Sequence, residues 1–327
     1  MLLISLQEFS LTIRLYKAFE DELGVTRSRL MNFAKTAPKR YKVYTIPKRT
    51  SGYRVIAHPS KSLKKIQKFL AGFLADIFIT HPNSFAYKKG VSIKDNASVH
   101  LGTKYLLKMD FSNFFNSITF DLLVSSCKEC EVKISLAELR LLEGLLFWNK
   151  TKTINGDLVL SVGAPTSPLV SNFVMYKFDI FISDYCKINN INYSRYADDI
   201  TFSTNDKNKL FGVTRVVKDI LSEHYSNKIT VNNVKTTFSS KAHNRHITGV
   251  TLTNDNKLSV GRERKRLIST LIHKYVINDI EKQDVTYLQG MLSFAIHVEP
   301  DFRGKMSKKY GSNVVTEILK LRVENDE

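Results

Sequence analysis

The sequence predicts an α+β protein in which a sheet is backed by helices and a smaller helical unit follows. Strand-like and helix-like segments succeed one another without the strict alternation that is typical of parallel α/β folds. The chain has 327 residues, of which 43% are hydrophobic and 24% charged, enough for a globular protein of two or three subdomains. After Asn254 a short extended stretch and two helical runs, 264–280 and 285–298, replace the mixed order. These runs are expected to form a separate C-terminal subdomain.

The main part of the chain contains four predicted helices and five extended segments. A long buried helix is predicted over 167–186, with Ser167 as its cap. Pro168 would lie in its first turn, where the missing N–H group costs nothing. Apolar residues at helical spacing indicate three more helices, at 63–77, 139–146 and 213–221. The extended segments are 105–110, 192–198, 199–203, 228–233 and 246–253.

Two aspartates stand side by side in "RYADDITFS", between residues that favour an extended chain. Aspartate is common in turns because its side chain bonds the local backbone. Favoured two-residue hairpin turns, however, place Gly or Asn where φ is positive, and "ADD" offers neither. From these residues alone, a turn and a functional site fit equally well.

A third carboxylate, Asp110, ends the apolar segment "YLLKMD", where burial would otherwise be unfavourable. Taken alone, it fits equally well as the cap of a helix that begins in "FSNFF". If the two segments are neighbouring strands, Asp110, Asp198 and Asp199 converge. Such a set suits phosphoryl transfer with two Mg²⁺ ions, which stabilise the attacking and leaving oxygens and neutralise the crowded charge. We therefore predict that these three aspartates are catalytic and bind two Mg²⁺ ions.

The chain has a formal net charge of +18, and an all-basic stretch lies near the N-terminus. No acidic residue falls between Glu22 and Asp76, and three tyrosines are interleaved there with Lys and Arg. A field of one sign with aromatic rings suits phosphate contacts and base stacking, whereas a membrane-surface role would concentrate the charge on one amphipathic helix. Nucleic acid is the predicted partner. The basic residues of this stretch are Arg27, Arg29, Lys35, Lys39, Arg40, Lys42, Lys48, Arg49, Arg54, Lys61, Lys64, Lys65 and Lys68.

The sequence predicts no membrane association. The longest apolar run, 69–79, is interrupted by Asp76 and falls short of the ~20 residues that a membrane span requires. The apolar opening of the chain meets polar residues at once and has no basic leader, unlike a signal peptide. Three cysteines, Cys127, Cys130 and Cys186, suit a reducing compartment. The protein is expected to be soluble and cytoplasmic.

Five motifs, in order, resemble those of reverse transcriptases. "YADD" is similar to their catalytic hairpin and "MDFSNFF" to their first carboxylate motif. "VGAPTSPLVSN" (162–172) resembles the segment beneath the template and incoming nucleotide, although Val162 stands where the family usually carries Gln. "NNVKTTF" is similar to the motif that places Lys235 near the leaving pyrophosphate. "IPKRTSGYRVIAHPSKSLKKIQKFL" (46–70) resembles the fingers motif.

This resemblance implies that deoxynucleoside triphosphates bind beside the aspartates. Lys48 and Arg54 would grip the triphosphate. Phe115 would lie beneath the ribose and collide with a 2′-hydroxyl group, whereas its neighbour Phe114 is expected in the core. From the residues alone, both rings fit packing roles as well. The implied nucleotide-binding residues are Lys48, Arg54, Phe111, Phe115 and Lys235.

Finer features resemble one bacterial branch, the retron reverse transcriptases. "NASVH" (96–100) matches their Asn-Ala-x-x-His element, and "ITG" (247–249) resembles their Val-Thr-Gly triplet, ahead of the basic "GRERKRL". The resemblance covers about 41–298 and implies recognition of a cognate RNA. From the residues alone, a structural role is favoured over RNA contact for His100. For Gly249, a structural role and RNA contact fit equally well. The implied RNA-binding residues are Asn96, His100, Ile247, Thr248, Gly249, Arg262, Arg264, Lys265 and Arg266.

The family fold implied is a right-hand polymerase with fingers, a palm made of an antiparallel sheet backed by helices, and a small helical thumb. The expected divisions are 1–104 for the N-terminal segment and fingers, 105–255 for the palm and 256–327 for the thumb. Part of 120–160 is expected to pack with the fingers.

The activity implied is that of an RNA-directed DNA polymerase which copies part of a cognate structured non-coding RNA into branched multicopy single-stranded DNA. Priming would use a 2′-hydroxyl group of that RNA, and the role would be anti-phage defence. Expected partners are the RNA, its DNA product, deoxynucleoside triphosphates and an effector protein encoded nearby. Two alternatives stay open. One is another bacterial reverse transcriptase, of intron-encoded or phage-defence type, which usually carries further domains; the other is a non-catalytic RNA-binding scaffold, which would be expected to have lost a carboxylate.

Overall fold

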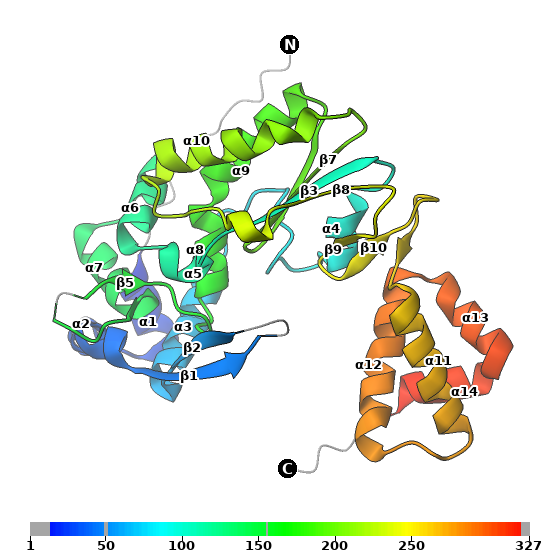
Figure 1. Cartoon of the computed structure of the whole chain (residues 1–327). Helices are drawn as coiled ribbons and strands as arrows, with labels where there is room; N and C mark the ends of the chain where they lie inside the picture. Colours follow the sequence, from blue (N-terminus) through cyan, green and yellow to red (C-terminus); the bar gives the residue numbers. More distant parts are fainter. Residues whose placement is uncertain (1–13, 49–51, 155, 322–327) are drawn as a thin grey trace.

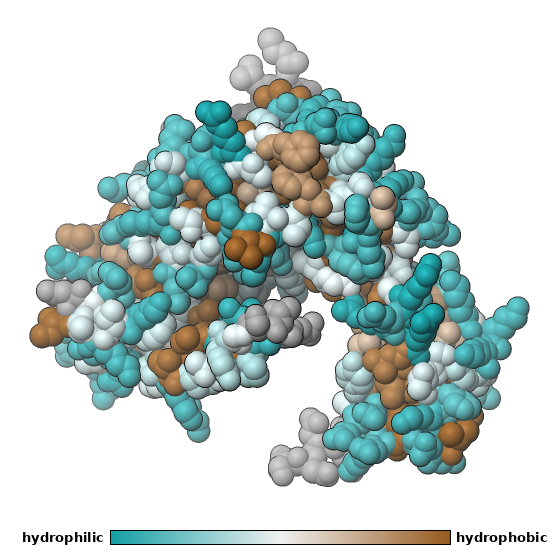
Figure 2. All heavy atoms as spheres, in the orientation of Figure 1, coloured by the Kyte–Doolittle hydropathy of each residue, from teal (hydrophilic) through white to brown (hydrophobic). Residues whose placement is uncertain are grey.

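The computed structural model describes residues 14–48, 52–154 and 156–321. The described chain forms two lobes joined by a central sheet (Figure 1). One lobe carries the N-terminal helices and a long hairpin, and the other consists of the C-terminal helices. An open hollow separates the two lobes in the space-filling view (Figure 2). The apolar opening of the chain and Arg49 of the basic stretch lie outside the described residues.

The N-terminal lobe contains three helices, a 3₁₀ turn and a hairpin whose two strands pair antiparallel along their whole length. Helix α3 begins where the Ser60 hydroxyl accepts a hydrogen bond from the Leu63 N–H group, which satisfies one of the unpaired donors at a helix start. The elements are α1 (Leu15–Leu23), α2 (Arg27–Thr36), η1 (Ala37–Lys39), β1 (Tyr41–Pro47), β2 (Tyr53–Pro59) and α3 (Lys61–Leu74).

Four strands form the central sheet, in the spatial order β6 (Asn192–Tyr196), β7 (Asp199–Thr204), β3 (Tyr105–Asp110) and β8 (Thr237–Ser240). Every neighbouring pair is antiparallel. Helix α9 (Tyr176–Ile188) packs against β6, and α10 (Val213–Tyr225) packs against α9, so helices back the sheet (Figure 1). The α+β class and the antiparallel sheet are thus confirmed, and β3 has the bounds that the sequence predicts.

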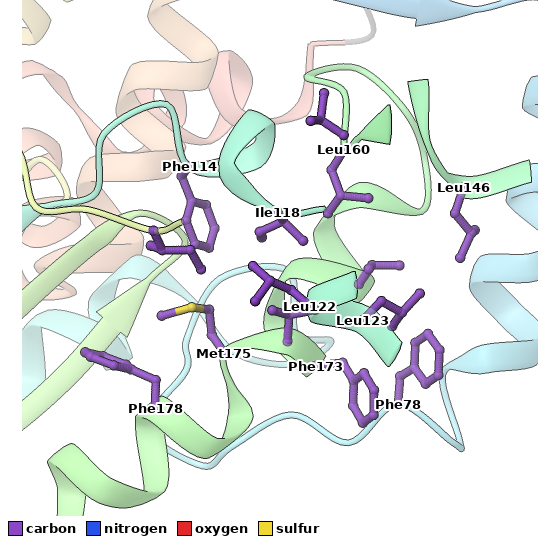
Figure 3. Close-up of a cluster of buried hydrophobic side chains, with 14 of the residues drawn as sticks. Phe78, Phe114, Ile118, Leu122, Leu123, Leu146, Leu160, Phe173, Met175 and Phe178 are labelled. Atoms are coloured by element: carbon purple, nitrogen blue, oxygen red, sulfur yellow. The ribbon is translucent and has the colours of Figure 1, made fainter. Parts of the chain in front are cut away.

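One large hydrophobic core joins the N-terminal lobe to the sheet. Figure 3 shows its centre, where Phe78 and Phe173 stack with ring centroids 4.3 Å apart and Leu122 lies near them. Helix α7 packs against α2 and α3, which places part of 120–160 in the N-terminal lobe. The elements of this region are α5 (Phe114–Ser117), α6 (Phe120–Glu129), α7 (Leu136–Leu146), β4 (Trp148–Asn149), β5 (Leu158–Val159) and α8 (Ser167–Val174).

Three sequence predictions need correction. The long helix over 167–186 is two helices, α8 and α9, because Met175 leaves helical geometry with ψ near 0°, and Thr166 rather than Ser167 stands at the N-cap position. Segment 228–233 forms only one bridge to the chain after β3 and continues into the 3₁₀ turn η3 (Asn233–Lys235). Segment 246–253 is a hairpin rather than one strand.

The C-terminal lobe has its own hydrophobic core. Besides the lobe's helices, this core includes Ala97 of α4 (Ile93–Ser98) and Leu106 of β3, so the lobe is anchored on the sheet. One helix spans Arg262–Val276, so it begins before the predicted run 264–280 and ends earlier. A second, Lys282–Val298, extends the predicted run 285–298, and two more were not predicted. Within the described part of the chain, no helix has the length and apolar character needed to cross a membrane. The elements are β9 (Arg245–Ile247), β10 (Val250–Leu252), β11 (Leu258–Ser259), α11 (Arg262–Val276), α12 (Lys282–Val298), α13 (Asp301–Tyr310) and α14 (Ser312–Lys320).

Candidate active site

The sheet brings the three predicted aspartates to one end of two neighbouring strands. Asp110, the last residue of β3, lies opposite Asp199, the first residue of β7. Asp198 precedes Asp199 in the turn between β6 and β7, and its carbonyl oxygen accepts a hydrogen bond of 3.0 Å from the Phe111 N–H group. The three carboxylates are therefore neighbours because of the strand register.

The β6–β7 turn is a two-residue hairpin turn made by Ala197 and Asp198. Ala197 has φ 58°, in the left-handed region that residues with a Cβ atom avoid. The Ala197 carbonyl accepts a hydrogen bond of 3.2 Å from Nη1 of Arg195, whose side chain is fully buried. The hydrogen bond from Arg195 therefore stabilises a turn conformation that the residues of the turn disfavour.

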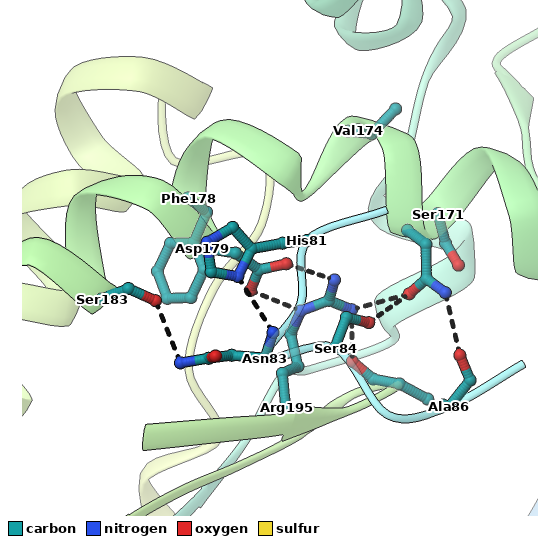
Figure 4. A network of polar contacts seen from close by, with 12 residues as sticks. His81, Asn83, Ser84, Ala86, Ser171, Val174, Phe178, Asp179, Ser183 and Arg195 are labelled. Atoms are coloured by element: carbon teal, nitrogen blue, oxygen red, sulfur yellow. Dashed lines mark hydrogen bonds and ion pairs between the residues drawn. The ribbon is translucent and has the colours of Figure 1, made fainter. Parts of the chain in front are cut away.

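Arg195 is the centre of a buried polar network (Figure 4). Its Nε and Nη2 atoms donate to the two carboxylate oxygens of Asp179 at 2.8 and 2.6 Å, a bidentate geometry that is strong for a guanidinium group. Burial alone would disfavour the charged guanidinium, but Asp179 outweighs that effect and raises the pKa of Arg195 above its ordinary value. The pair joins the consecutive elements α9 and β6, 16 positions apart in the sequence, and was not predicted.

The same network reaches the loop that follows α3. Oδ1 of Asn172 on α8 accepts hydrogen bonds from Arg195 Nη1 at 3.1 Å and from the Ser84 hydroxyl at 3.0 Å. Asn172 Nδ2 in turn donates to the Ala86 carbonyl at 2.9 Å. The β6–β7 hairpin, helices α8 and α9 and the loop after α3 are therefore joined through buried hydrogen bonds.

Burial and neighbouring charges perturb the carboxylates of Asp198 and Asp199. Desolvation raises the pKa of Asp198, and the charge of Asp110 adds to this effect. Asp199 is exposed at the start of β7, yet desolvation of its carboxylate and then the charges of Asp198 and Asp110 raise its pKa to about 6. Lys235 Nζ lies 2.8 Å from Oδ2 of Asp110, and this hydrogen bond raises the pKa of Lys235. The site is acidic, crowded and already attracts a cation.

This crowding predicts an unusual pH dependence of stability in buffer without divalent ions. Because the pKa of Asp199 rises from 3.8 to about 6 on folding, the folded state binds more protons than the unfolded state between these values. The Asp199 contribution to the free energy of unfolding should therefore decrease as pH rises through this window. Melting temperatures of wild type and Asp199→Asn, measured from pH 4 to 7, should be similar at low pH. Above pH 6 the variant should have the higher melting temperature. A constant difference would contradict the assignment.

The donor set fits a hard divalent cation, because all three side chains offer carboxylate oxygens. The Lys235 ammonium group shows that Asp110 accepts a positive charge at this end of the sheet. Among the residues that the structure describes, no three His, Cys, Asp or Glu side chains are already gathered as ligands.

The predicted nucleotide-binding residues lie at different depths. Arg54 on β2 is exposed, and its charge acts against the raised pKa of Asp198; Lys48 is exposed at the end of β1. Phe115 is partly buried against the core. The prediction of a nucleotide contact is wrong for the ring of Phe111, which is 1% exposed and packs in the core. The core position expected for Phe114 is confirmed, since it is 3% exposed.

Segment 162–172 lies against the hairpin of the N-terminal lobe. The Val162 carbonyl accepts a hydrogen bond of 3.0 Å from the Ala57 N–H group of β2. Gly163 has φ 119°, and a Cβ atom there would lie 3.3 Å from Cγ2 of Ile56. Glycine therefore allows both the backbone conformation and the close approach to β2.

Three of the predicted RNA-binding residues are buried, so direct RNA contacts by their side chains are wrong. His100 is fully buried, and its Nδ1 and Nε2 atoms lie 2.7 and 2.8 Å from the hydroxyl oxygens of Ser203 and Ser194. Burial lowers the pKa of His100 to about 3, so it is neutral at pH 7. Asn96 and Ile247 are each 1% exposed.

Thr248 and Gly249 form the β9–β10 turn, which α4 and α11 contact through side-chain hydrogen bonds. Asn96 Nδ2 donates to the Thr248 hydroxyl at 3.2 Å, and Arg264 Nη1 donates to the Gly249 carbonyl at 2.6 Å. Lys265 forms an ion pair of 2.7 Å with Glu299. These contacts join α4, the turn and α11. Arg262 and Arg266 are exposed on α11.

Residues 46–252 match the family described as reverse transcriptase (RNA-dependent DNA polymerase). The chain is 49% identical to Retron Ec83 reverse transcriptase of Escherichia coli, over 94% of this chain and 96% of that protein. It is 30% identical to Retron Ec86 reverse transcriptase of Escherichia coli, over 89% and 88% of the two chains. A solved telomerase structure from Candida albicans, in complex with the TWJ fragment of telomeric RNA, is similar with a TM-score of 0.48 and 14% identity, over 87% and 57% of the two chains. The motif matches and the two relatives together show that this chain belongs to the reverse transcriptases, which are RNA-directed DNA polymerases, and among them to the bacterial retron type.

Proposed function

We propose that the enzyme copies part of a cognate structured RNA into branched multicopy single-stranded DNA at the site formed by Asp110, Asp198 and Asp199. The observation that carries the proposal is the register pairing of Asp110 with Asp199 beside the Asp198 turn, in a chain of retron type. Three acceptor-only side chains, of which Asp198 and Asp199 have raised pKa values, suit two Mg²⁺ ions, which would stabilise the attacking and leaving oxygens.

Side chains of this protein would bind and orient the nucleotide. Lys235 balances the charge of Asp110 before substrate enters and would face the leaving pyrophosphate afterwards. Lys48 and Arg54 project from the β1–β2 hairpin, and their positive charge would hold the triphosphate. The ring of Phe115 would exclude a 2′-hydroxyl group at the ribose. Catalysis by these residues would thus consist of orientation and charge stabilisation.

Arg54→Ala should weaken nucleotide binding more than it slows chemistry. Charge-assisted hydrogen bonds to phosphate contribute about 1.5–3 kcal/mol, so we expect the KM for deoxynucleotides to rise about 10- to 100-fold. Lys48→Ala should act in the same direction but less strongly, because an ammonium group lacks the bidentate geometry of Arg. Arg215→Ala is a matched control, since Arg215 is 88% exposed on α10. Unchanged KM values in both hairpin variants would contradict the triphosphate role.

Recognition of RNA would divide between general and selective contacts. The basic residues between Glu22 and Asp76 would bind phosphates irrespective of sequence, with affinity that falls with salt. Arg262 and Arg266, exposed on α11, are our candidates for selective contacts, because shape and base edges distinguish one structured RNA from another.

The retron activity is tested with the RNA encoded beside the gene and with a generic primed RNA. We expect DNA synthesis on the first without an added primer, and a product in which DNA is joined to an internal 2′-hydroxyl of the RNA. A debranching nuclease should separate the two strands. The double variant Arg262→Ala/Arg266→Ala should lose activity on the adjacent RNA while it retains extension of the generic primer.

Equal activity of the wild type on both RNAs, or only linear products, would reject the retron reaction in favour of a general reverse transcriptase. Equal loss on both substrates in the double variant would reject selective recognition by α11. We assign the product to anti-phage defence, together with an effector protein encoded nearby. Plaque counts on cells that carry the wild-type gene or Asp198→Asn, with the neighbouring genes intact, test this role: equal counts would contradict it.

A further inference from the structure

Tyr87 is an aromatic residue beside the active site that neither the sequence motifs nor the mechanism uses. It lies in the loop after α3, and its side chain is 55% exposed. Its ring centroid is 6.4 Å from that of Phe115, with 55° between the ring planes. The ring centroid of Phe115 also lies 5.5 Å from that of the core residue Phe114. Phe115 thus neighbours one core ring and one solvent-exposed ring.

The backbone holds Tyr87 in a conformation that tyrosine rarely adopts. Its φ is 60°, in the left-handed region that is costly for bulky residues. The preceding residue, Ala86, is fully buried, and its carbonyl accepts the hydrogen bond from Asn172. The backbone from which the Tyr87 ring projects is therefore anchored, whereas surface loops are usually mobile.

The electrostatic surroundings of Tyr87 also belong to the active site. After desolvation, the charge of Asp198 is the largest cause that raises the pKa of the Tyr87 hydroxyl, and Arg54 acts in the opposite direction. The ring therefore lies within electrostatic range of both the Asp198 turn and the β1–β2 hairpin.

We propose that Tyr87 is a positioning residue for sugar selection, which supports the ring of Phe115 from the solvent side so that a ribose 2′-hydroxyl cannot displace it. A ring that excludes one hydroxyl group must resist rotation when that group presses on it. Phe114 supports Phe115 on the core side, and Tyr87 completes the support by its ring rather than by its hydroxyl. The proposal rests on the role proposed above for Phe115.

The test compares kcat/KM for a deoxynucleotide and the matching ribonucleotide on one primed RNA template. Tyr87→Ala should reduce discrimination about two- to tenfold, the change that corresponds to losing one aromatic pair. Tyr87→Phe should retain discrimination, since the ring remains. Tyr287→Ala is a matched control, because Tyr287 on α12 is 50% exposed. Circular dichroism and Tm show that each variant folds.

A double variant separates support of Phe115 from direct contact with the nucleotide. Phe115→Val alone should reduce discrimination more than Tyr87→Ala, and Tyr87→Ala/Phe115→Val should equal Phe115→Val, because residues that act through one another are not additive. Multiplied effects, or an unchanged ratio in Tyr87→Ala, would overturn the proposal while the role of Phe115 stands. If Phe115→Val leaves the ratio of the two kcat/KM values unchanged, the steric role of Phe115 is refuted. The role of Tyr87 is then refuted as well.

Discussion

Asp198→Asn should abolish DNA synthesis, with a loss of roughly 10³-fold or more, the scale seen when a group that stabilises transition-state charge is removed. Asparagine keeps the size of the side chain and the backbone bond from Phe111 to the Asp198 carbonyl, so the turn should keep its shape. What is lost is one of three negative charges at the end of β3 and β7. Single-nucleotide extension on primed RNA with Mg²⁺ measures the effect.

Binding of RNA by the same variant should survive, because the basic N-terminal stretch does not depend on the aspartates. The double variant Asp198→Asn/Asp199→Asn should be little worse than either single variant, since groups that act as a unit are not additive. Asp219→Asn is a surface control, with a side chain that is 68% exposed on α10. Normal turnover in Asp198→Asn would refute the assignment of the site.

Asp179→Asn should cause the largest loss of stability among the changes considered. It leaves the Arg195 guanidinium fully buried without its counter-charge, and removing one partner of a buried pair costs about 3–5 kcal/mol. Urea unfolding gives the free energy directly. Since Arg195 also holds the Ala197 carbonyl, kcat should fall as well at temperatures where the variant remains folded.

Two comparisons make the expectation for Asp179 specific. Arg195→Met/Asp179→Asn leaves no unpaired charge in the interior, so it should recover part of the stability lost by Asp179→Asn. Asp206→Asn breaks an exposed pair, in which the two side chains are 29% and 58% exposed, and should cost about 1 kcal/mol or less. A loss in Asp179→Asn no larger than that in Asp206→Asn would contradict the role of the buried network.

The meeting of Asp110, Asp198 and Asp199 at one end of the sheet could be predicted from the sequence because the signal is local. Asp110 ends an apolar strand, and Asp198 and Asp199 stand between two extended segments, where carboxylates are conspicuous. The turn at Ala197 was harder, because turn rules expect Gly or Asn where φ is positive. The chain forms the turn without either residue, since Arg195 supplies a hydrogen bond from the interior.

Predictions that depended on knowing which side chains face the interior were less successful. Phe111 directly follows Asp110, yet its ring enters the core, and the polar side chains of Asn96 and His100 are buried with polar partners. Nothing local distinguishes a polar residue that binds RNA from one that bonds a distant strand. The pairing of Asp179 with Arg195 likewise exists only once helix and sheet have docked.

The loop at 83–85 has a further effect on how the sheet meets other chains. Ser84 bridges Arg195 in parallel, and the backbone of Arg195 bonds both Asn83 and Phe85 at 2.8 Å, so the outer edge of β6 is covered at Arg195. An uncovered strand at that position would be a template for aggregation. Because the covering segment comes from much earlier in the chain, it can dock only after a long loop has closed, which is a slow kind of contact to form. Partial unfolding that releases 83–85 would therefore expose an aggregation-prone edge of β6. The same event would remove a support of the β6–β7 hairpin.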